Sequence, residues 1–154
     1  MERILIVQSP VGQLTLTQEA QALTGLRFGT QPQQGAEGPT PLLAETARQL
    51  EEYFAGKRTE FSLPLAPKGT DFQLRVWQAL LRIPYGETRS YGELAAMVGN
   101  PKACRAVGGA NHRNPLPILI PCHRVVGAKG SLTGYAGGLA VKEFLLKLEA
   151  GGRL

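Results

Sequence analysis

The chain has 154 residues, of which 43% are hydrophobic and 19% are charged. This is enough for one ordinary domain or two small ones with a real core, and it excludes a wholly disordered chain. No window approaches the roughly 18 apolar residues of a membrane-spanning helix, so we expect no membrane partner. The first residues lack the pattern of a secretory signal, which favours the cytoplasm.

Cysteine and histidine are scarce. The two cysteines, Cys104 and Cys122, are too few for a disulfide framework, and a disulfide between them is not expected in a cytosolic chain. Together with His112 and His123 they match no known zinc spacing. We therefore expect no metal and no cofactor.

Positive charge is concentrated in the C-terminal half. The formal net charge is +5. Residues 1–66 carry five Lys/Arg and seven Asp/Glu, a net charge of −2, whereas residues 67–154 carry twelve and five, a net charge of +7. A basic segment joined to a near-neutral support is typical of nucleic-acid binding, although a solvated basic surface gives the same count. We predict two domains, 1–66 and 67–154.

The first domain begins with short runs that are β-branched or rich in leucine, at residues 3–8, 13–17 and 22–28. They predict a small antiparallel meander. Residues 29–40 are rich in Gly, Pro and Gln and are expected to form a loop. Residues 61–65 are either a last strand or an extended linker.

One helix is expected in the first domain. Thr40 is its N-cap, Pro41 takes the first helical position, and Gly56 ends it. Helical spacing predicts an apolar face. That face consists of Leu42, Leu43, Ala47, Leu50 and Phe54.

The second domain is predicted to be mostly helical. Thr70 with Gln73, and Ser90 with Glu93, form two capping boxes that begin helices. Asn100-Pro101 is expected to cap a third helix at once, running to residue 109 or 110. The second and third helices, joined by a tight turn, resemble a helix-turn-helix.

Residues 102–110 form an unusual helix, with small side chains around a single long one, Arg105. Two adjacent glycines, Gly108 and Gly109, disfavour a helix by about 1 kcal/mol each. Tight packing against a neighbouring helix would explain them, and so would close approach to a bulky partner. The last helix is expected at residues 139–150, with Val141, Leu145 and Leu148 on one face.

Cys122 is the most informative residue. It lies between an apolar run, residues 117–120, and His123. An imidazole can activate a thiol, but the side chains of sequence neighbours rarely face each other, so direct contact needs an unusual turn or a bridging water. The alternative is a small buried cysteine without chemistry. Cys104 is expected to be a small packing residue.

Several ordered motifs carry a resemblance to the O6-alkylguanine-DNA alkyltransferase family. The heptad IPCHRVV at 120–126 resembles its active-site signature, and IPYGETRSY at 83–91 resembles the approach to its first DNA-contacting helix. RAVGGA at 105–110 resembles the recognition helix, and GYAGG at 134–138 resembles the pocket loop. The resemblance covers residues 67–150 almost without a gap. It implies an α+β chain, with a small ribonuclease H-like N-terminal domain followed by a winged-helix-like domain.

The family transfers an alkyl group from guanine O6 in DNA to its own cysteine, once per molecule. The resemblance thus implies a catalytic role for Cys122, and implies that His123 acts on it through a water. Glu149 would orient His123, and Tyr91 would act on the nucleotide's phosphate and lend a proton to the leaving guanine. The partner would be double-stranded DNA carrying O6-alkylguanine, with O4-alkylthymine as a second lesion, and the protein would be a monomer.

The resemblance further implies a DNA-binding set and a substrate pocket. Arg105 would enter the base stack in place of the flipped nucleotide, and Asn114 would tie the recognition helix to the active-site strand. The DNA-binding residues would be Tyr91, Gly92, Asn100, Arg105, Ala106, Gly108 and Ala128. The pocket residues would be Asn114, Val125, Tyr135 and Ala136, with the carbonyls of Cys122 and Val125 reading the base.

Two departures from the family pattern stand out. Residues 1–66 contain no Cys and no His, so the N-terminal zinc site of some relatives is absent. Ala136 stands where many relatives have a hydroxyl residue, so one hydrogen bond to guanine O6 is missing. Two alternatives stay open: a lesion-binding damage-signalling module without transfer, and a cysteine hydrolase that uses Cys122 and His123.

Overall fold

The computed structural model describes residues 2–29, 35–127 and 130–151. The chain divides into two compact units, Met1–Lys68 and Gly69–Leu154. In the ranges that the structure describes, no helix combines the length and the apolar character needed to cross a membrane.

The first unit contains a four-stranded sheet in the order β3-β2-β1-β4. Strands β1 (Glu2–Ser9), β2 (Gly12–Glu19) and β3 (Ala22–Phe28) form the predicted antiparallel meander. Strand β4 (Ala36–Glu37) adds a parallel edge beside β1, so the sheet is mixed and the loop predicted at residues 29–40 is partly wrong. Two residues are too few to leave an alternating pattern in the sequence.

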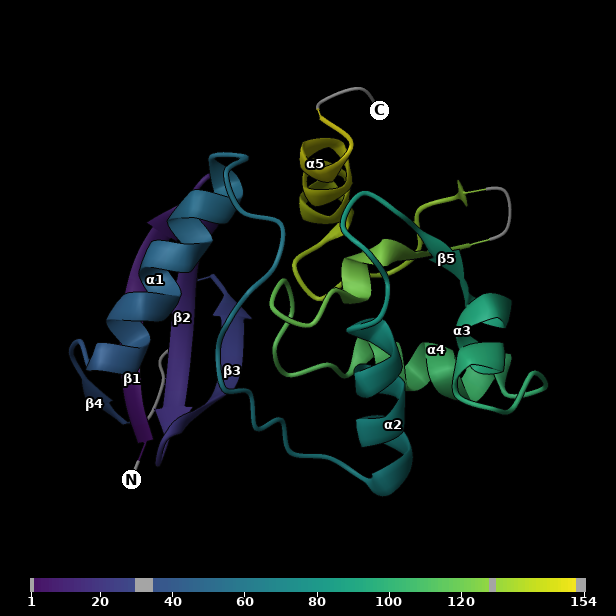
Figure 1. Ribbon diagram of the computed structural model, residues 1–154, viewed down its shortest axis with the longest axis horizontal. Coiled ribbons are helices and arrows are strands. Elements are labelled where there is room, and N and C mark those ends of the chain that lie inside the picture. Colours follow the sequence, from purple (N-terminus) through teal and green to yellow (C-terminus); the bar gives the residue numbers. More distant parts are fainter. Residues whose placement is uncertain (1, 30–34, 128–129, 152–154) are drawn as a thin grey trace. The chain divides into compact units, whose positions relative to one another are not determined.

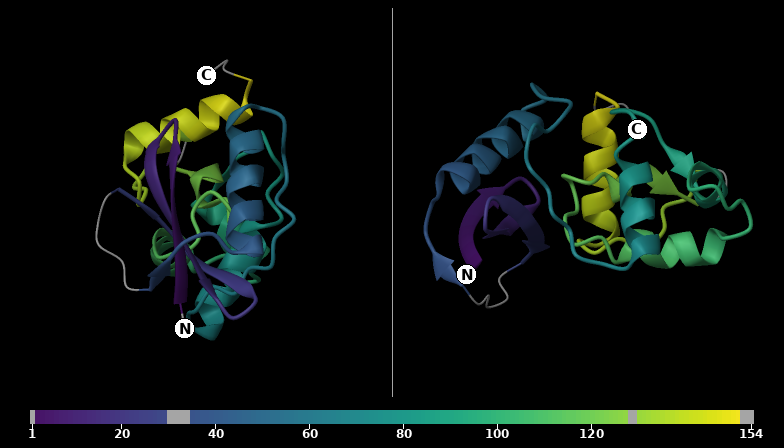
Figure 2. Two further views of the ribbon diagram at one scale, coloured as in Figure 1. Left: turned by 90° about the vertical axis from the view of Figure 1, so that its left-hand side faces the viewer. Right: turned by 60° about the horizontal axis from the view of Figure 1, so that its bottom comes forward.

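Helix α1 (Pro41–Phe54) packs against one face of this sheet (Figures 1 and 2). Thr40 caps it as predicted, since its hydroxyl accepts a hydrogen bond from the Leu43 amide. The predicted apolar face is wrong in part, because Leu42, Ala47 and Phe54 are only half-buried. The buried residues include polar ones whose hydrogen bonds are satisfied locally. They are Leu43, Thr46, Gln49, Leu50 and Tyr53.

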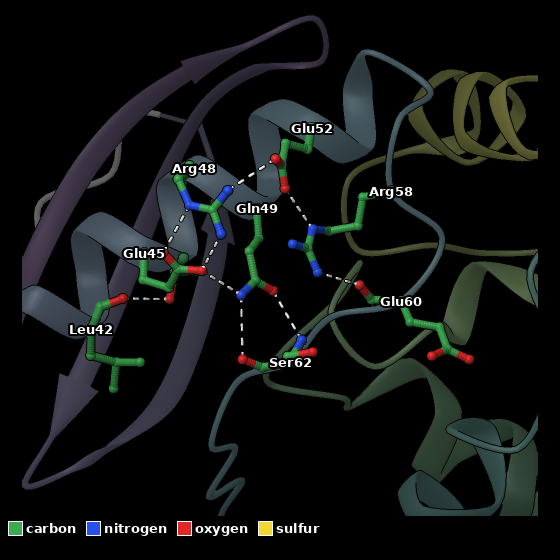
Figure 3. Close-up of polar contacts among 9 residues, drawn as sticks. Leu42, Glu45, Arg48, Gln49, Glu52, Arg58, Glu60 and Ser62 are labelled. Carbon is green, nitrogen blue, oxygen red and sulfur yellow. Dashed lines mark hydrogen bonds and ion pairs between the residues drawn. The ribbon is translucent and has the colours of Figure 1, made fainter.

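The segment after α1 is held to the helix by a polar network (Figure 3). Gln49 donates to the Ser62 carbonyl and accepts from the Ser62 amide, so it fixes the backbone of the segment at one point. Leu65 pairs with Leu23 in an isolated bridge. Residues 61–65 are therefore a linker with one bridge. The charged members of the network, called the α1 cluster below, are Glu45, Arg48, Glu52 and Arg58.

The second unit is helical, and the predicted fold class is confirmed. Helices α2 (Asp71–Leu80) and α3 (Tyr91–Met97) begin at the two predicted capping boxes, and both reciprocal hydrogen bonds form in each box. Helix α4 (Cys104–His112) completes the helix-turn-helix. The indole of Trp77 in α2 donates to the Ala110 carbonyl in α4 at 2.9 Å, so the two helices are fixed to each other through a buried hydrogen bond.

The predicted start of α4 is wrong. Asn100-Pro101 does not cap it; instead the Ala103 amide bonds to the Asn100 carbonyl in a turn, and the helix begins at Cys104 without a side-chain cap. It runs to His112, beyond the predicted end. A proline in the first turn supplies no amide donor, so it is compatible with a turn as well as with a helix start.

The segment that carries Cys122 is a short 3-10 helix, η1 (Cys122–Arg124), followed by strand β6 (Val125–Val126). Strand β6 pairs in parallel with β5 (Arg89–Ser90), which lies directly before α3. Helix α5 (Leu139–Glu149) contacts η1. The second unit thus brings the start of α3, the η1 turn and α5 together.

Candidate functional site

Cys122 lies at the start of a tight turn. Its amide donates to the Ile120 carbonyl at 2.7 Å, and the Arg124 amide donates to the Pro121 carbonyl at 3.0 Å. Ile118, just upstream, has a φ of +73° although it is β-branched and buried. Such a conformation costs about 1–3 kcal/mol and persists only where the surroundings impose it. The approach to the cysteine is therefore a constrained backbone.

Asn114 provides part of that constraint. Its amide group donates to the Ile120 carbonyl at 2.8 Å, and its side-chain oxygen accepts from the Leu116 amide at 2.9 Å. Asn114 also lowers the pKa of the Cys122 thiol, against the larger effect of burial. Asn114 follows α4 directly, so one buried side chain joins the end of that helix to the segment that carries Cys122.

His123, Arg124 and Glu149 form a buried triad. His123 Nε2 lies 2.7 Å from Glu149 Oε2, and Arg124 Nε donates to Glu149 Oε1 at 2.7 Å. Arg124 Nη2 also reaches Oε2, at 3.1 Å, so the Arg124–Glu149 pair is bidentate. The side chains of His123 and Glu149 are 0% and 1% exposed. The carboxylate is therefore shared between a permanent cation and an imidazole, away from solvent.

This sharing sets the tautomer of His123. Burial raises the pKa of Glu149, but the hydrogen bonds and charges of His123 and Arg124 outweigh it and bring the pKa to about 2. An ionised carboxylate only accepts, so His123 carries its proton on Nε2 and leaves Nδ1 as an acceptor. Burial lowers the pKa of His123, although Glu149 opposes this, so the neutral ring is favoured. Nδ1 is buried, with no hydrogen-bond partner among the described residues.

Burial raises the pKa of the Cys122 thiol to about 11, and the Asn114 hydrogen bond and the Lys142 charge oppose this only in part. The thiolate is the reactive form, so the resting cysteine is protonated and needs a base. A neutral imidazole with a vacant lone pair is such a base. The site therefore holds the three kinds of group that an activated nucleophile needs: a thiol, a neutral imidazole with a vacant lone pair, and a carboxylate bonded to that imidazole.

A second chain of polar contacts lies beside the triad. The Lys142 ammonium, on α5, is fully buried and donates to the Val125 carbonyl at 2.7 Å. It also donates to the Thr133 carbonyl and hydroxyl, at 3.1 and 3.4 Å. The Thr133 hydroxyl is 2.6 Å from the Tyr91 hydroxyl. Tyr91, the first residue of α3, is thereby connected to α5.

The residues implied in the substrate pocket differ in burial. Tyr135 is 8% exposed, and its ring meets that of His123 edge to face, with centroids 6.5 Å apart. Val125 is buried, with its carbonyl bonded to Lys142, whereas Ala136 is exposed. The structure thus brings Asn114, Val125 and Tyr135 to the buried site and leaves Ala136 at the surface.

The residues implied in DNA binding lie mainly on the outside of the helix-turn-helix. Arg105 and Ala106 are exposed on α4, and Gly92 and Asn100 are exposed on α3 and in the following turn. Ala128 lies outside the described residues. The structure therefore separates an exposed set on α3 and α4 from the buried set around Cys122.

The glycines of α4 are not required by internal packing. A Cβ on Gly108 would lie 3.6 Å from the Tyr91 ring, an ordinary contact, and a Cβ on Gly109 would meet nothing within 4 Å in the described part of the chain. Tight packing against a neighbouring helix does not explain Gly109, which faces outward. The expectation that Cys104 is a packing residue is also wrong, because it lies exposed at the start of α4.

Sequence reasoning missed three residues of the site: Arg124, Thr133 and Lys142. A signal for Lys142 was present, since it lies seven residues before Glu149, which is two helical turns and hence the same face of α5. The predicted apolar face of α5 is wrong at Val141 and Leu148, which are only half-buried. The buried residues are Lys142, Leu145, Leu146 and Glu149.

The described residues include no group of three or more His, Cys, Asp or Glu side chains that could hold a metal ion. Both cysteines are free thiols.

Two family models match the chain. Residues 4–67 match the ribonuclease-like domain of 6-O-methylguanine DNA methyltransferase, and residues 71–151 match its DNA-binding domain. The methylated-DNA–protein-cysteine methyltransferase of Methanosarcina acetivorans is 53% identical over 150 residues, covering 94% of this chain and 96% of that one. The constitutive enzyme of Bacillus subtilis is 52% identical over 151 residues, covering 92% of each chain.

Solved structures of similar proteins indicate the same family. The Mycobacterium tuberculosis O6-methylguanine methyltransferase superposes with a TM-score of 0.91 at 48% identity, covering 100% of this chain and 96% of that one. The structure of the M. tuberculosis OGT in complex with DNA gives 0.89 at 51% identity, covering 97% and 94%. The chain therefore belongs to the O6-methylguanine DNA methyltransferase family, and it is a DNA-binding repair protein with methylated-DNA–protein-cysteine methyltransferase activity.

Proposed function

We propose that Cys122 accepts the alkyl group in a single, irreversible transfer. The Cys122 sulfur attacks the alkyl carbon, the carbon–O6 bond breaks, and its electron pair stays with the guanine. The thiol proton leaves to a base, and the leaving guanine gains a proton from Tyr91, which regains one from solvent, so the reaction balances without a cofactor. The product is a thioether with no ready route back, so each molecule repairs one lesion.

One observation carries this assignment: the buried triad leaves His123 Nδ1 as an acceptor, and His123 directly follows the buried Cys122 in the same 3-10 turn. His123 takes the Cys122 proton through a bridging water. Glu149 stabilises the imidazolium that forms, and Arg124 keeps that carboxylate ionised. Because the resting thiol is protonated, the cysteine reacts slowly with electrophiles until its proton has moved to His123.

The substrate of this proposal is double-stranded DNA that carries O6-alkylguanine, with O4-alkylthymine as a second lesion. The target nucleotide leaves the stack, Arg105 takes its place, and Tyr135 covers the base in the pocket. The exposed face of α4, with Gly109 and Ala106, allows close approach to the minor groove. The same proposal has Asn100 and Gly92 near the backbone, the protein acting as a monomer, and the reaction taking place in the cytoplasm.

The direct test is mass spectrometry after incubation with a duplex that contains one O6-methylguanine. The peptide holding Cys122 should gain about 14 Da, one methylene group, at no more than one equivalent per protein. Cys104→Ser is the matched control, because Cys104 is free and exposed; it should react fully, whereas Cys122→Ser should not. An adduct on Cys104, or no adduct on folded and reduced protein, would refute the assignment.

Arg105 provides a separate test of nucleotide flipping. Arg105→Ala should slow transfer in duplex DNA about tenfold or more and should slow it much less in single strands, where no stack has to be opened. Single-turnover rates on the two substrates measure this. Lys102→Ala, which removes a neighbouring exposed charge, should weaken binding to both in a salt-dependent way. If Arg105→Ala slowed transfer equally in duplex and single-stranded DNA, the proposed insertion of Arg105 into the base stack would be wrong.

A further inference from the structure

The contacts of Lys142 begin a hydrogen-bond chain that leads through Thr133 to Tyr91. An ammonium group has three donors and no acceptor. Lys142 Nζ meets three acceptors: the carbonyls of Val125 and Thr133 and the Thr133 hydroxyl. The number of acceptors equals the number of donors, which suits the protonated form even though burial lowers the pKa of Lys142.

The Thr133 hydroxyl has only one proton. Since its oxygen accepts from Lys142, that proton is free to be donated, and the Tyr91 hydroxyl lies 2.6 Å away. If Thr133 donates to the Tyr91 oxygen, the Tyr91 proton must point elsewhere. The hydrogen-bond chain then runs from Lys142 through Thr133 to Tyr91, and it ends in a phenol proton for which the described residues offer no other acceptor.

We propose that Thr133 is a positioning residue, which orients the Tyr91 hydroxyl so that its proton is presented to the leaving guanine. This inference rests on the proposed function, in which Tyr91 is the proton donor. When Tyr91 gives up its proton, the phenolate oxygen keeps the Thr133 hydrogen bond, now charge-assisted and stronger. The Lys142 charge, one hydrogen bond further away, stabilises the same state.

The backbone supports this geometry. Tyr91 begins α3, whose cap Ser90 pairs with Val126 through β5 and β6. The ring of Tyr91 lies against Gly108 of α4. The Val125 carbonyl, which the family resemblance implies reads the base, accepts a hydrogen bond from Lys142 at 2.7 Å. One buried cation thus connects a base-reading carbonyl to the proton donor.

The test separates leaving-group protonation from thiol activation. Guanine needs a proton as it leaves, whereas iodide does not. In a Cys104→Ser background, Thr133→Val should slow methyl transfer from O6-methylguanine duplex about tenfold, a fraction of the roughly 100-fold that a general acid contributes. Methylation of Cys122 by methyl iodide should keep its rate. Thr133→Ser restores the hydroxyl and should recover most of the transfer rate.

Three outcomes would overturn the proposal: an unchanged transfer rate in Thr133→Val, an equal slowing with methyl iodide, or a failure of Thr133→Ser to recover. The Tyr91→Phe background adds a fourth criterion, because the Thr133→Val loss should disappear there; a loss that persists refutes coupling through the phenol. If Tyr91→Phe alone leaves the transfer rate unchanged, the donor role of Tyr91 in the proposed function fails as well. Thermal melts and DNA anisotropy check that each variant is folded and binds.

Discussion

The two units each contain a cluster of carboxylates and guanidinium groups, but the clusters differ in burial. In the α1 cluster, Arg48 and Glu45 are paired at 2.6 Å with side chains 53% and 40% exposed. In the buried triad, Arg124 and Glu149 are paired at 2.7 Å with side chains 9% and 1% exposed. Exposed pairs contribute little to stability, and buried pairs recover at best their own desolvation. A contribution to stability therefore explains neither the α1 cluster nor the buried triad. Of the two, only the triad contains an imidazole.

The largest expected effect follows from removing the shared carboxylate. Glu149→Gln leaves Arg124 buried with a neutral partner and removes the charge that fixes the His123 tautomer. The free energy of unfolding should fall by about 3–5 kcal/mol. The rate of methyl transfer should fall by about 100-fold or more. Urea denaturation and single-turnover kinetics measure the two quantities.

Glu52→Gln is the matched control in the α1 cluster, where it breaks ion pairs to Arg48 and Arg58. It should leave the transfer rate unchanged and shift the urea midpoint only slightly, because both partners remain solvated. Similar losses of stability in the two variants would show that burial does not distinguish the clusters.

The next effect is the dependence of stability on pH. The pKa of His123 is lowered by folding, so the unfolded chain binds a proton first and stability falls as the pH drops below about 6.5. The pKa of Glu149 is also lowered, to about 2, so its contribution is present above about 4.5 and is lost as the pH falls toward 2. Both groups therefore make the protein sensitive to acid.

Salt separates the two clusters in the same experiment. The pKa of Glu45, in the α1 cluster, is lowered to about 2 by Arg48 and Gln49, but this carboxyl is solvated. At about 1 M salt the Debye length is roughly 3 Å, which screens exposed pairs far more than buried ones. Thermal melts from pH 7 to pH 3 should keep most of their acid dependence in high salt. Loss of that dependence in salt would assign it to the α1 cluster instead.

What could be predicted from the sequence depends on how far apart the interacting residues lie. The Ser90–Glu93 capping box spans three residues, and its local sequence motif alone predicts it. The His123–Glu149 pair spans 26 residues, and only the family resemblance pointed to it. Strand β4 was missed because its partner is β1, more than 30 residues away. Local chemistry is encoded in short motifs, whereas long-range pairing is not.

Lys142 illustrates the same limit. A lysine in an amphipathic helix is usually solvated, and its burial here depends on acceptors at Val125 and Thr133 that lie on other segments. The prediction for Cys104 is wrong in the opposite direction. A small residue in a helix of small residues suggests packing, but the start of α4 lies at the surface. In both cases the tertiary position of a segment decides burial, and residue type does not.

A smaller effect is expected from a neutral residue beside the α1 cluster. Gln49 is buried and bonds both to Glu45 and to the Ser62 backbone. Gln49→Ala removes two hydrogen bonds to the backbone of Ser62, which is itself exposed, and at roughly 0.5–1.5 kcal/mol for each bond this should cost about 1–3 kcal/mol in urea denaturation. Gln49→Glu is the comparison, since it retains an acceptor for the amide but loses the donor. A neutral outcome for both variants would mean that the linker is held mainly by the Leu23–Leu65 bridge.

The smallest effect is expected from Arg48→Ala, although it removes two ion pairs at once. Both pairs are exposed, so each guanidinium and carboxylate can exchange its partner for water, and ordering a long side chain offsets the attraction. The melting temperature should change by less than in Gln49→Ala, and the remaining difference should shrink in about 1 M salt. Because Arg48 and Gln49 share Glu45, the double variant tests whether they act together. If Arg48→Ala lowered the melting temperature as much as Gln49→Ala, the exposed ion pairs and not the buried Gln49 side chain would hold the linker. The α1 cluster would then differ from the buried triad only in degree.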